Sequence, residues 1–195
     1  MKRDSQKLLQ KEMALQEKVL LIGNRIPKDF FTTAGVGQSD VTIHAGSYHL
    51  ALKDAGIERC NIVTYSSILP AIATEIEKPD SMVHGSVLET IMACSNAKKG
   101  QTATAGLIFG WLYDKVTGKK YGGIVCEYNE NGSEEEAIKS LKARLNELYR
   151  NGFSENYEIK DIKLITRSFI PNKNFGTAIV ALCFVNYLYP TFEYS

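Results

Sequence analysis

The sequence lacks an excess of either charge. Its 195 residues hold 23 Lys and Arg against 22 Asp and Glu, which gives a formal net charge of +1. This balance gives no electrostatic reason to expect a nucleic-acid or anionic-membrane partner. There is no low-complexity segment or internal repeat to divide the chain, and 44% of its residues are hydrophobic, as in an ordinary globular protein. We therefore expect a single domain over residues 1–195, with residues 1–29 as a peripheral N-terminal extension.

Cysteine motifs and long apolar runs are also missing. No C-x-x-C pair occurs, so zinc spacing and the dense pattern of a small disulfide-rich domain are both absent. No segment reaches the roughly 20 apolar residues of a membrane span, and charged residues interrupt residues 2–18, where a signal peptide needs an apolar stretch. These absences favour a cytoplasmic protein without a membrane partner. The cysteines are Cys60, Cys94, Cys126 and Cys183.

Helical signals occur at three places. The strongest begins with Ser133 and Glu136, which form a capping box, and ends at Asn151-Gly152. Behind the box, apolar residues recur at helical spacing: Ile138, Leu141, Leu145 and Leu148. Residues 46–55 predict a second helix that stops at Gly56. Residues 1–20 predict an amphipathic helix.

Several apolar runs rich in β-formers predict strands, separated by turn residues. The lone G-x-G at Gly35 and Gly37 does not follow a strong strand signal, so we interpret it as a turn. Strands with few helices indicate an α+β fold, with helices on a largely antiparallel sheet. The predicted strands cover residues 60–65, 82–94, 102–113, 121–128, 157–170 and 175–188.

Familiar catalytic motifs are absent: there is no G-x-S-x-G, Walker A or H-E-x-x-H. His44 and His49 are five residues apart, not on one helix face, so we expect no metal site. The pair Ser66-Ser67 follows a predicted strand. Serines punctuate turns everywhere, but a strained turn after a strand is also a place where a hydroxyl can attack the preceding carbonyl.

Several segments together resemble the pyruvoyl-dependent arginine decarboxylases, in particular their bacterial subgroup. The segment around the serine pair, Asn61 to Pro70, resembles the self-cleavage segment of that family. The other similar segments are Thr33–Asp40, His84–Ala93, Gly122–Tyr128, Phe175–Ala178 and Ala181-Leu182. Their order and spacing hold from about residue 30 to residue 190.

The resemblance implies a four-layer αββα sandwich that assembles as a homotrimer. It also implies an enzyme that decarboxylates a basic amino acid, arginine, to agmatine and CO₂. It implies that Ser67 attacks the Ser66 carbonyl, cuts the chain between residues 66 and 67, and becomes a covalent pyruvoyl cofactor that serves as an electron sink. Glu127 is then the acid that protonates the substrate, and Asn61 assists processing. The implied substrate-binding residues are His49, Leu52, Cys60 and Ile68.

Three points stay open. Glu127 also fits a solvent-facing strand position, and Asn61 also fits a residue that caps a turn. His49 stands where the family carries an aspartate for the guanidinium, which histidine cannot bind in a bidentate manner. Either another acid, namely Asp40, Asp54 or Glu89, compensates, or the alignment with the family is off by one residue. The alternative function is therefore an inactive or altered-specificity homologue that keeps the fold and the oligomer.

Overall fold

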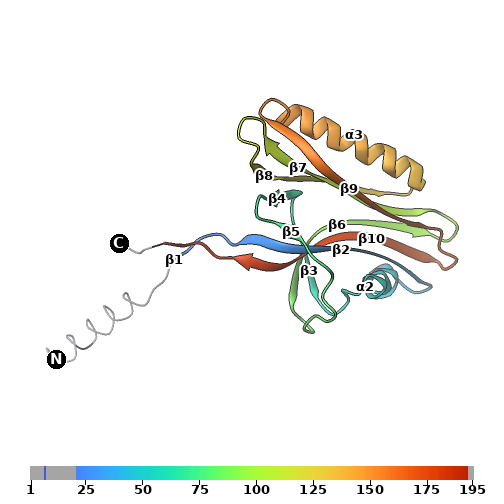
Figure 1. Ribbon diagram of the computed structural model, residues 1–195. Helices are drawn as coiled ribbons and strands as arrows, with labels where there is room; N and C mark the ends of the chain where they lie inside the picture. The colour runs from blue at the N-terminus through green and yellow to red at the C-terminus, as the bar shows by residue number, and fades with distance from the viewer. Residues whose placement is uncertain (1–6, 8–20, 193–195) are drawn as a thin grey trace. The chain divides into compact units, whose positions relative to one another are not determined.

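The computed structural model describes Lys7 and residues 21–192 of the chain (Figure 1). The chain divides into a larger unit of residues 27–186 and a smaller unit that holds the two chain ends. In the described part of the smaller unit, β1 (Leu21–Ile22) pairs antiparallel with β11 (Thr191–Phe192). The helix predicted within residues 1–20 lies outside the described residues, apart from Lys7.

The first sheet of the larger unit has five strands in the order β3-β6-β10-β2-β5. Its two central long strands, β6 and β10, pair antiparallel, with Phe175 opposite Lys98 and Phe184 opposite Glu89. The short strands β3 and β5 are parallel to their neighbours β6 and β2. The bounds are β2 (Ile26–Ser39), β3 (Asn61–Thr64), β5 (Thr74–Glu75), β6 (Val87–Lys98) and β10 (Phe175–Leu188).

The second sheet has four strands in the order β4-β8-β7-β9, and all of its pairs are antiparallel. A bulge in β9 lies opposite the stretch between Phe109 and Trp111, and it places Asp161 at a φ of 51°. The bounds are β4 (Ile68–Pro70), β7 (Ala103–Asp114), β8 (Lys120–Glu130) and β9 (Tyr157–Phe169). The strands predicted from the apolar runs are thus confirmed, although the run from residue 82 begins to pair only at Val87.

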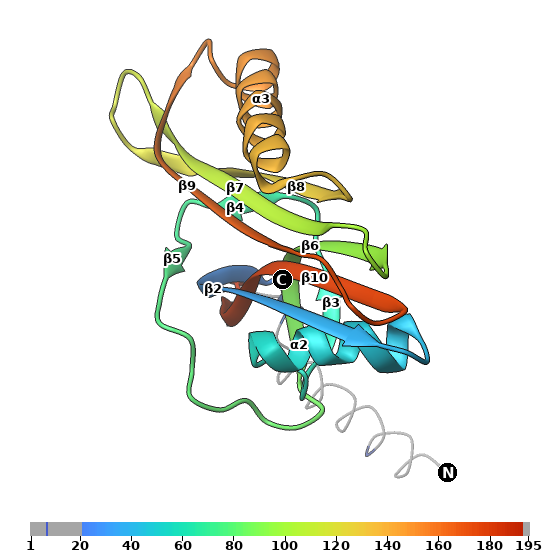
Figure 2. The same ribbon diagram turned by 90° about the vertical axis from the view of Figure 1, so that its right-hand side faces the viewer.

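The two sheets stack face to face, with one helix on each outer face (Figure 2). Helix α3 (Glu134–Gly152) covers the four-stranded sheet, and α2 (His49–Ala55) covers the five-stranded sheet. Aromatic rings join the sheets in the middle, since Phe30 of β2 meets Phe109 of β7 at 5.9 Å between ring centroids. The predicted αββα sandwich is confirmed.

The capping box at the start of α3 is present as predicted. Glu136 N–H donates to Ser133 Oγ at 3.2 Å, and Ser133 N–H donates to Glu136 Oε2 at 2.7 Å. The helix buries Ala137, Leu141 and Leu145 against β7 and β8, as the helical spacing of its apolar residues requires.

The predicted turn at Gly35 and Gly37 is wrong, because both glycines lie inside the long strand β2. A Cβ atom on Gly35 would lie 2.3 Å from the carbonyl oxygen of Ala51, and one on Gly37 would lie 2.1 Å from that of Ser47. The glycines therefore let the helical segment pack directly on the strand backbone. This segment opens as a π-helix, η1 (Ile43–Tyr48), before it continues as α2.

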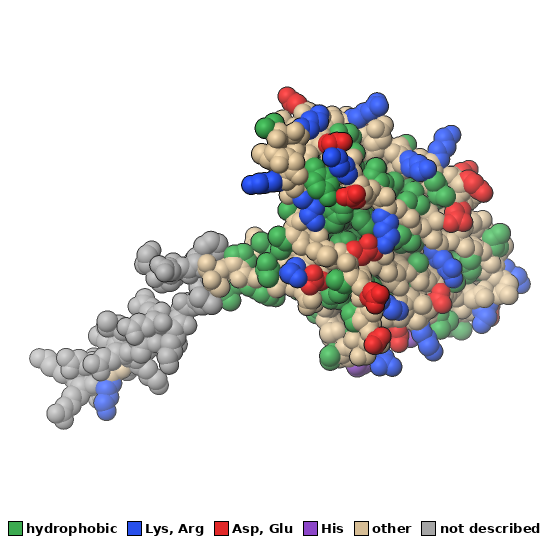
Figure 3. Space-filling view, viewed as in Figure 1, with side chains coloured by type: hydrophobic (Ala, Val, Ile, Leu, Met, Phe, Trp, Pro, Cys, Tyr) green, Lys and Arg blue, Asp and Glu red, His purple; other side chains and the backbone are tan. Residues whose placement is uncertain are grey.

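Among the described residues, no helix is long and apolar enough to cross a membrane. On the face shown in Figure 3, basic and acidic side chains are interspersed over the larger unit and do not gather into a patch of one sign. This surface agrees with the near-neutral charge of the sequence.

Candidate active site

The serine pair lies in the short connection from β3 to β4, where the chain crosses from one sheet to the other. Before the pair, Tyr65 N–H donates to the carbonyl oxygen of Thr90 on β6 at 2.7 Å. After it, the carbonyl oxygen of Ser67 accepts from Val125 N–H on β8 at 3.0 Å. The bond between Ser66 and Ser67 is therefore held from both sides by main-chain hydrogen bonds to different sheets.

A tight turn is centred on Ser67. The N–H of Ile68 donates to the carbonyl oxygen of Ser66 at 2.9 Å, which closes a three-residue γ-turn. Ser67 has a negative φ, since Asp161 is the one non-glycine residue with a positive φ among those described.

Glu127 of β8 is the partner of the Ser67 side chain. Ser67 Oγ donates a short hydrogen bond to Glu127 Oε1. Side chains alternate along β8: Ile124 and Cys126 pack in the cluster beneath α3, so Glu127 faces the opposite side, toward the other sheet. The two residues are 60 positions apart in the sequence, and the pairing of β4 with β8 brings them together.

Two glycines allow this pairing. Leu69 of β4 lies opposite Gly123, and Pro70 lies opposite Gly122. A Cβ atom on Gly122 would lie 2.8 Å from the carbonyl oxygen of Leu69, which is too close for any real contact. Side chains at these positions would therefore push β4, and with it Ser67, away from Glu127.

Arg144 of α3 holds the same stretch of β8 from the opposite face. Its Nη1 donates to the carbonyl oxygen of Glu127 at 2.7 Å, and its guanidinium forms an ion pair with Glu130. Sequence reasoning missed Arg144, because a charged residue on an amphipathic helix normally faces solvent. Nothing in its spacing marks it as a strand contact.

Asn61, predicted to assist processing, is the first residue of β3. Its Nδ2 donates to the carbonyl oxygen of Gly85 at 2.8 Å, and its N–H donates to that of Ser86 at 2.8 Å. Within the described residues of one chain, its side-chain amide thus binds the loop before β6 and makes no hydrogen bond to Ser66.

Within the described part of one chain, the predicted substrate-binding residues come together only in part: Leu52 and Cys60 pack in one hydrophobic cluster, whereas His49 and Ile68 lie outside it. His49 begins α2 and is exposed, whereas Leu52 is buried at 7% exposure under the same helix. Cys60 lies 3.4 Å from both Met82 Sδ and Ser86 Oγ, and it lines a cavity of about 330 Å³. Ile68 lines a different cavity, of about 300 Å³, beside Gly122 and Gly123.

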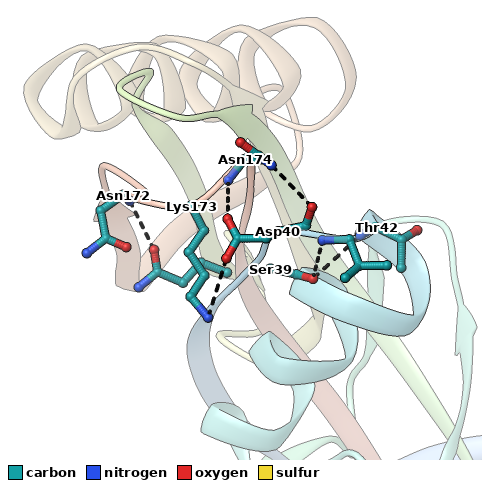
Figure 4. A network of polar contacts seen from close by, with 8 residues as sticks. Ser39, Asp40, Thr42, Asn172, Lys173 and Asn174 are labelled. Atoms are coloured by element: carbon teal, nitrogen blue, oxygen red, sulfur yellow. Dashed lines mark hydrogen bonds and ion pairs between the residues drawn. The ribbon is translucent and has the colours of Figure 1, made fainter.

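Two of the three acids named as replacements for an aspartate at position 49 are surface residues that bind neighbouring segments. Asp40 binds the loop between β9 and β10 (Figure 4): its Oδ1 accepts from Asn174 N–H at 3.2 Å, and Lys173 Nζ lies 3.9 Å away. Asp54 Oδ2 accepts from Val36 N–H at 2.9 Å.

The third candidate, Glu89, is 3% exposed and lies on β6 opposite Phe184. It is therefore buried within the sheet and is not presented on an open surface.

Cys94 and Cys126 pack in the clusters beneath α2 and α3, and their thiols do not compete with Ser67 as nucleophiles. Burial raises the pKa of Cys94 to about 11, and burial followed by the nearby Glu127 raises the pKa of Cys126 to about 11. Both thiols stay protonated at neutral pH, and a protonated thiol is a poor nucleophile. A serine hydroxyl bound to a carboxylate is thus the group suited to attack.

This geometry fits a residue that is converted into a pyruvoyl group. The hydroxyl of Ser67 is bound to a carboxylate, and the carbonyl group of Ser66 before it is fixed by its own hydrogen bond. The folded chain thus places together a hydroxyl group, a carboxylate and a carbonyl group, the three groups that such a conversion requires.

Comparison with known proteins gives the same family. The family model for pyruvoyl-dependent arginine decarboxylase matches residues 29–189. The chain is 34% identical to the arginine decarboxylase AaxB of Chlamydia pneumoniae over 188 residues, which cover 85% of this chain and 94% of that protein.

Two further relatives align over shorter stretches. The chain is 38% identical to AaxB of Chlamydia abortus over 121 residues, 55% of this chain and 62% of that protein. It is 32% identical to the enzyme of Methanocella arvoryzae over 114 residues, 57% of this chain and 66% of that protein. These two alignments span just under two thirds of the relatives' lengths. Because the family model covers most of the residues that build the two sheets and the serine turn, the chain belongs to the pyruvoyl-dependent arginine decarboxylases, a family of carboxy-lyases that use a covalently bound pyruvoyl group.

Proposed function

We propose that this protein cuts itself between Ser66 and Ser67 to make a pyruvoyl group and then decarboxylates arginine to agmatine and CO₂. The observation that carries the proposal is the hydrogen bond from Ser67 Oγ to Glu127 Oε1. It joins Ser67, the proposed nucleophile of the self-cleavage, to Glu127, the carboxyl group that the family resemblance assigns to the decarboxylation.

In the proposed self-cleavage, Ser67 Oγ forms a bond to the carbonyl carbon of Ser66, and Glu127 Oε1 takes the proton of the hydroxyl group. The C–N bond then breaks, the nitrogen of residue 67 takes up a proton, and an ester replaces the amide. Loss of the Cα proton of residue 67 breaks the Cβ–O bond, which releases Ser66 as a carboxylate and leaves dehydroalanine. Water then converts the new chain end to the pyruvoyl group and releases ammonia.

In the decarboxylation, the pyruvoyl group supplies the electron sink that an amino acid needs when it loses CO₂. Glu127 lies beside the residue that bears this group. Its carboxyl group is therefore placed to hold a proton and deliver it to the substrate Cα after CO₂ has left. One side chain would thus serve as proton acceptor in processing and as proton donor in turnover.

Arginine is proposed as the substrate because the relatives are arginine decarboxylases. One observation favours the altered-specificity alternative: His49 is exposed and offers no carboxylate, while Asp40 and Asp54 bind neighbouring segments. Under that alternative the self-cleavage remains, but another amino acid is preferred.

We also propose that the active form is a homotrimer in the cytoplasm. Two of the predicted substrate residues, His49 and Ile68, are exposed on one chain and lie outside the cluster that holds Leu52 and Cys60. This separation supports a site completed by a neighbouring copy, and closed cyclic symmetry suits such a shared site. The described cysteines are all free, as expected in a reducing compartment.

The test is CO₂ release and agmatine formation by the purified protein, with Ser67→Ala as the control. A panel of arginine, lysine, ornithine, histidine and aspartate distinguishes the two candidates. Turnover of arginine by the wild type and not by Ser67→Ala supports the proposal. Cleaved wild-type protein that prefers another member of the panel supports the alternative, and activity in Ser67→Ala contradicts both.

A further inference from the structure

The carbonyl group that is cut has a hydrogen-bond donor built into the chain just beyond it. The N–H of Ile68 lies 2.9 Å from the carbonyl oxygen of Ser66, across the γ-turn centred on Ser67. We propose that this main-chain N–H is the oxyanion donor of the self-cleavage reaction. The inference rests on the proposed function and assigns a catalytic group to its first step.

The charge of the reaction develops where this donor already points. When Ser67 Oγ bonds to the carbonyl carbon of Ser66, the π electrons of the C=O bond move onto its oxygen. That oxygen becomes an anion until the C–N bond to residue 67 breaks and the C=O bond reforms. A hydrogen bond to an anionic oxygen is roughly twice as strong as one to a neutral carbonyl, so the Ile68 N–H stabilises the transition state more than the starting chain.

The donor is held in place from both sides. Ile68 is the first residue of β4 and lies opposite Ile124, and the Val125 N–H binds the Ser67 carbonyl at 3.0 Å. On the other side, Tyr65 N–H binds Thr90 at 2.7 Å. A donor that needs no rearrangement during the reaction gives the largest electrostatic effect.

The side chain that the family resemblance assigns to processing is engaged elsewhere within one chain. Asn61 Nδ2 donates to the carbonyl oxygen of Gly85 at 2.8 Å and lies at the far end of β3. In the described chain, the hydrogen bond that reaches the Ser66 oxygen therefore comes from the backbone of Ile68.

The test replaces the N–H group of Ile68 by an oxygen atom. Ile68 is replaced by the corresponding α-hydroxy acid, which turns the amide between residues 67 and 68 into an ester and keeps the side chain. The full-length chain is made by cell-free translation, and cleavage between residues 66 and 67 is followed with time by mass spectrometry. We expect cleavage about 10²–10³ times slower, the usual effect of losing one oxyanion donor.

A matched control is the same replacement at Tyr65, which removes the neighbouring N–H bond to Thr90 but leaves the Ser66 oxygen bonded. It should slow cleavage by no more than about tenfold, the upper effect of one ordinary main-chain hydrogen bond. Equal slowing by both esters would overturn the proposal, because the Ile68 N–H would then only hold the loop. Cleavage of the Ile68 ester at the wild-type rate would also overturn it.

A second measurement covers the case in which the Ile68 ester does not fold. In the uncleaved Ser67→Ala chain, a ¹³C label on the Ser66 carbonyl reports its hydrogen bond through its infrared stretching frequency. We expect a frequency below that of a ¹³C amide carbonyl that accepts no hydrogen bond, measured on a labelled model amide in an apolar solvent, and a frequency as high as this reference contradicts the proposal. Failure of the wild type to cleave at all would instead reject the proposed function, so the two failures are distinguishable.

Discussion

In the proposed self-cleavage, the hydroxyl of Ser67 gives its proton to Glu127, and the same carboxyl group later serves the substrate. We predict that Glu127→Gln folds but cleaves itself more slowly, and that turnover by its cleaved fraction falls about 10²–10⁴-fold, the usual effect of a positioned acid or base. Gel densitometry measures the first effect, and agmatine formation measures the second.

Glu130→Gln is the matched control. Glu130 lies on the same strand, but it is exposed and forms an ion pair with Arg144 at the helix side. It should leave cleavage and turnover close to the wild type. Wild-type rates in Glu127→Gln would mean that the proton moves through another group.

The other prediction for a single residue concerns His49. An exposed histidine cannot form a bidentate pair with a guanidinium group, so His49→Asp should lower KM for arginine. The expected gain is one to two decades, from about 1.5–3 kcal/mol of charge-assisted hydrogen bonding. The change should fall mainly on KM, because the distal group contacts substrate and transition state alike.

Steady-state kinetics with arginine and lysine measure this change. An unchanged KM for arginine in His49→Asp would mean that residue 49 points away from the pocket or that another carboxylate already binds the guanidinium. The variant does not alter Ser67 or Glu127, so its chain should be cleaved like the wild type.

The pairing of β4 with β8 is the element that places Ser67 beside Glu127. Gly122→Ala would put a Cβ atom 2.8 Å from the carbonyl oxygen of Leu69, so the strands must separate. We predict that this variant loses about 1–3 kcal/mol of unfolding free energy, as for other overpacked sites, and that its self-cleavage slows. Urea unfolding in the uncleaved Ser67→Ala background measures the stability change.

Gly152→Ala is the control for this experiment, because nothing lies within 4 Å of its added Cβ atom and the residue ends α3. It should change neither stability nor cleavage by much. If Gly122→Ala also changed neither stability nor self-cleavage, the pairing of β4 with β8 would not depend on a glycine at position 122.

Long elements could be predicted from the sequence, and short or unusual ones could not. Helix α3 has a capping box and a regular apolar period, and β9 and β10 are long β-rich runs, so their boundaries fall within a residue or two. β2 was misinterpreted because its glycines, which look like turn residues, serve a close approach of η1 and α2. A three-residue strand such as β4 has no period to detect.

The residues of the site likewise include some that the sequence predicts and some that it does not. Ser67 and Glu127 were singled out through resemblance to a family, because one sequence does not reveal which strands pair across 60 residues. Arg144 and the N–H of Ile68 gave no signal at all, since the first resembles a surface charge and the second is a backbone group. The resemblance implies one substrate site for His49, Leu52, Cys60 and Ile68, yet in one chain Cys60 and Ile68 line different cavities.

At the level of the whole molecule, this scattering leads to a prediction about assembly. If neighbouring copies complete the site, the cleaved protein should remain a trimer. Light scattering under native conditions should then give a mass near three times 21.7 kDa. A fully active monomer would contradict the shared site, and the position of the predicted substrate residues would need another explanation.

Intact-mass spectrometry of the purified, denatured protein tests the proposed self-cleavage most directly. We predict two fragments, residues 1–66 and a chain that begins with a pyruvoyl group at position 67. Their masses should sum to that of the uncleaved chain plus one water minus one ammonia, as the β-elimination and hydrolysis steps require. Ser67→Ala should give one uncut chain. Wild-type protein that stays uncut, or fragments whose sum exceeds the uncut chain by a whole water, as simple hydrolysis produces, would contradict the proposed chemistry.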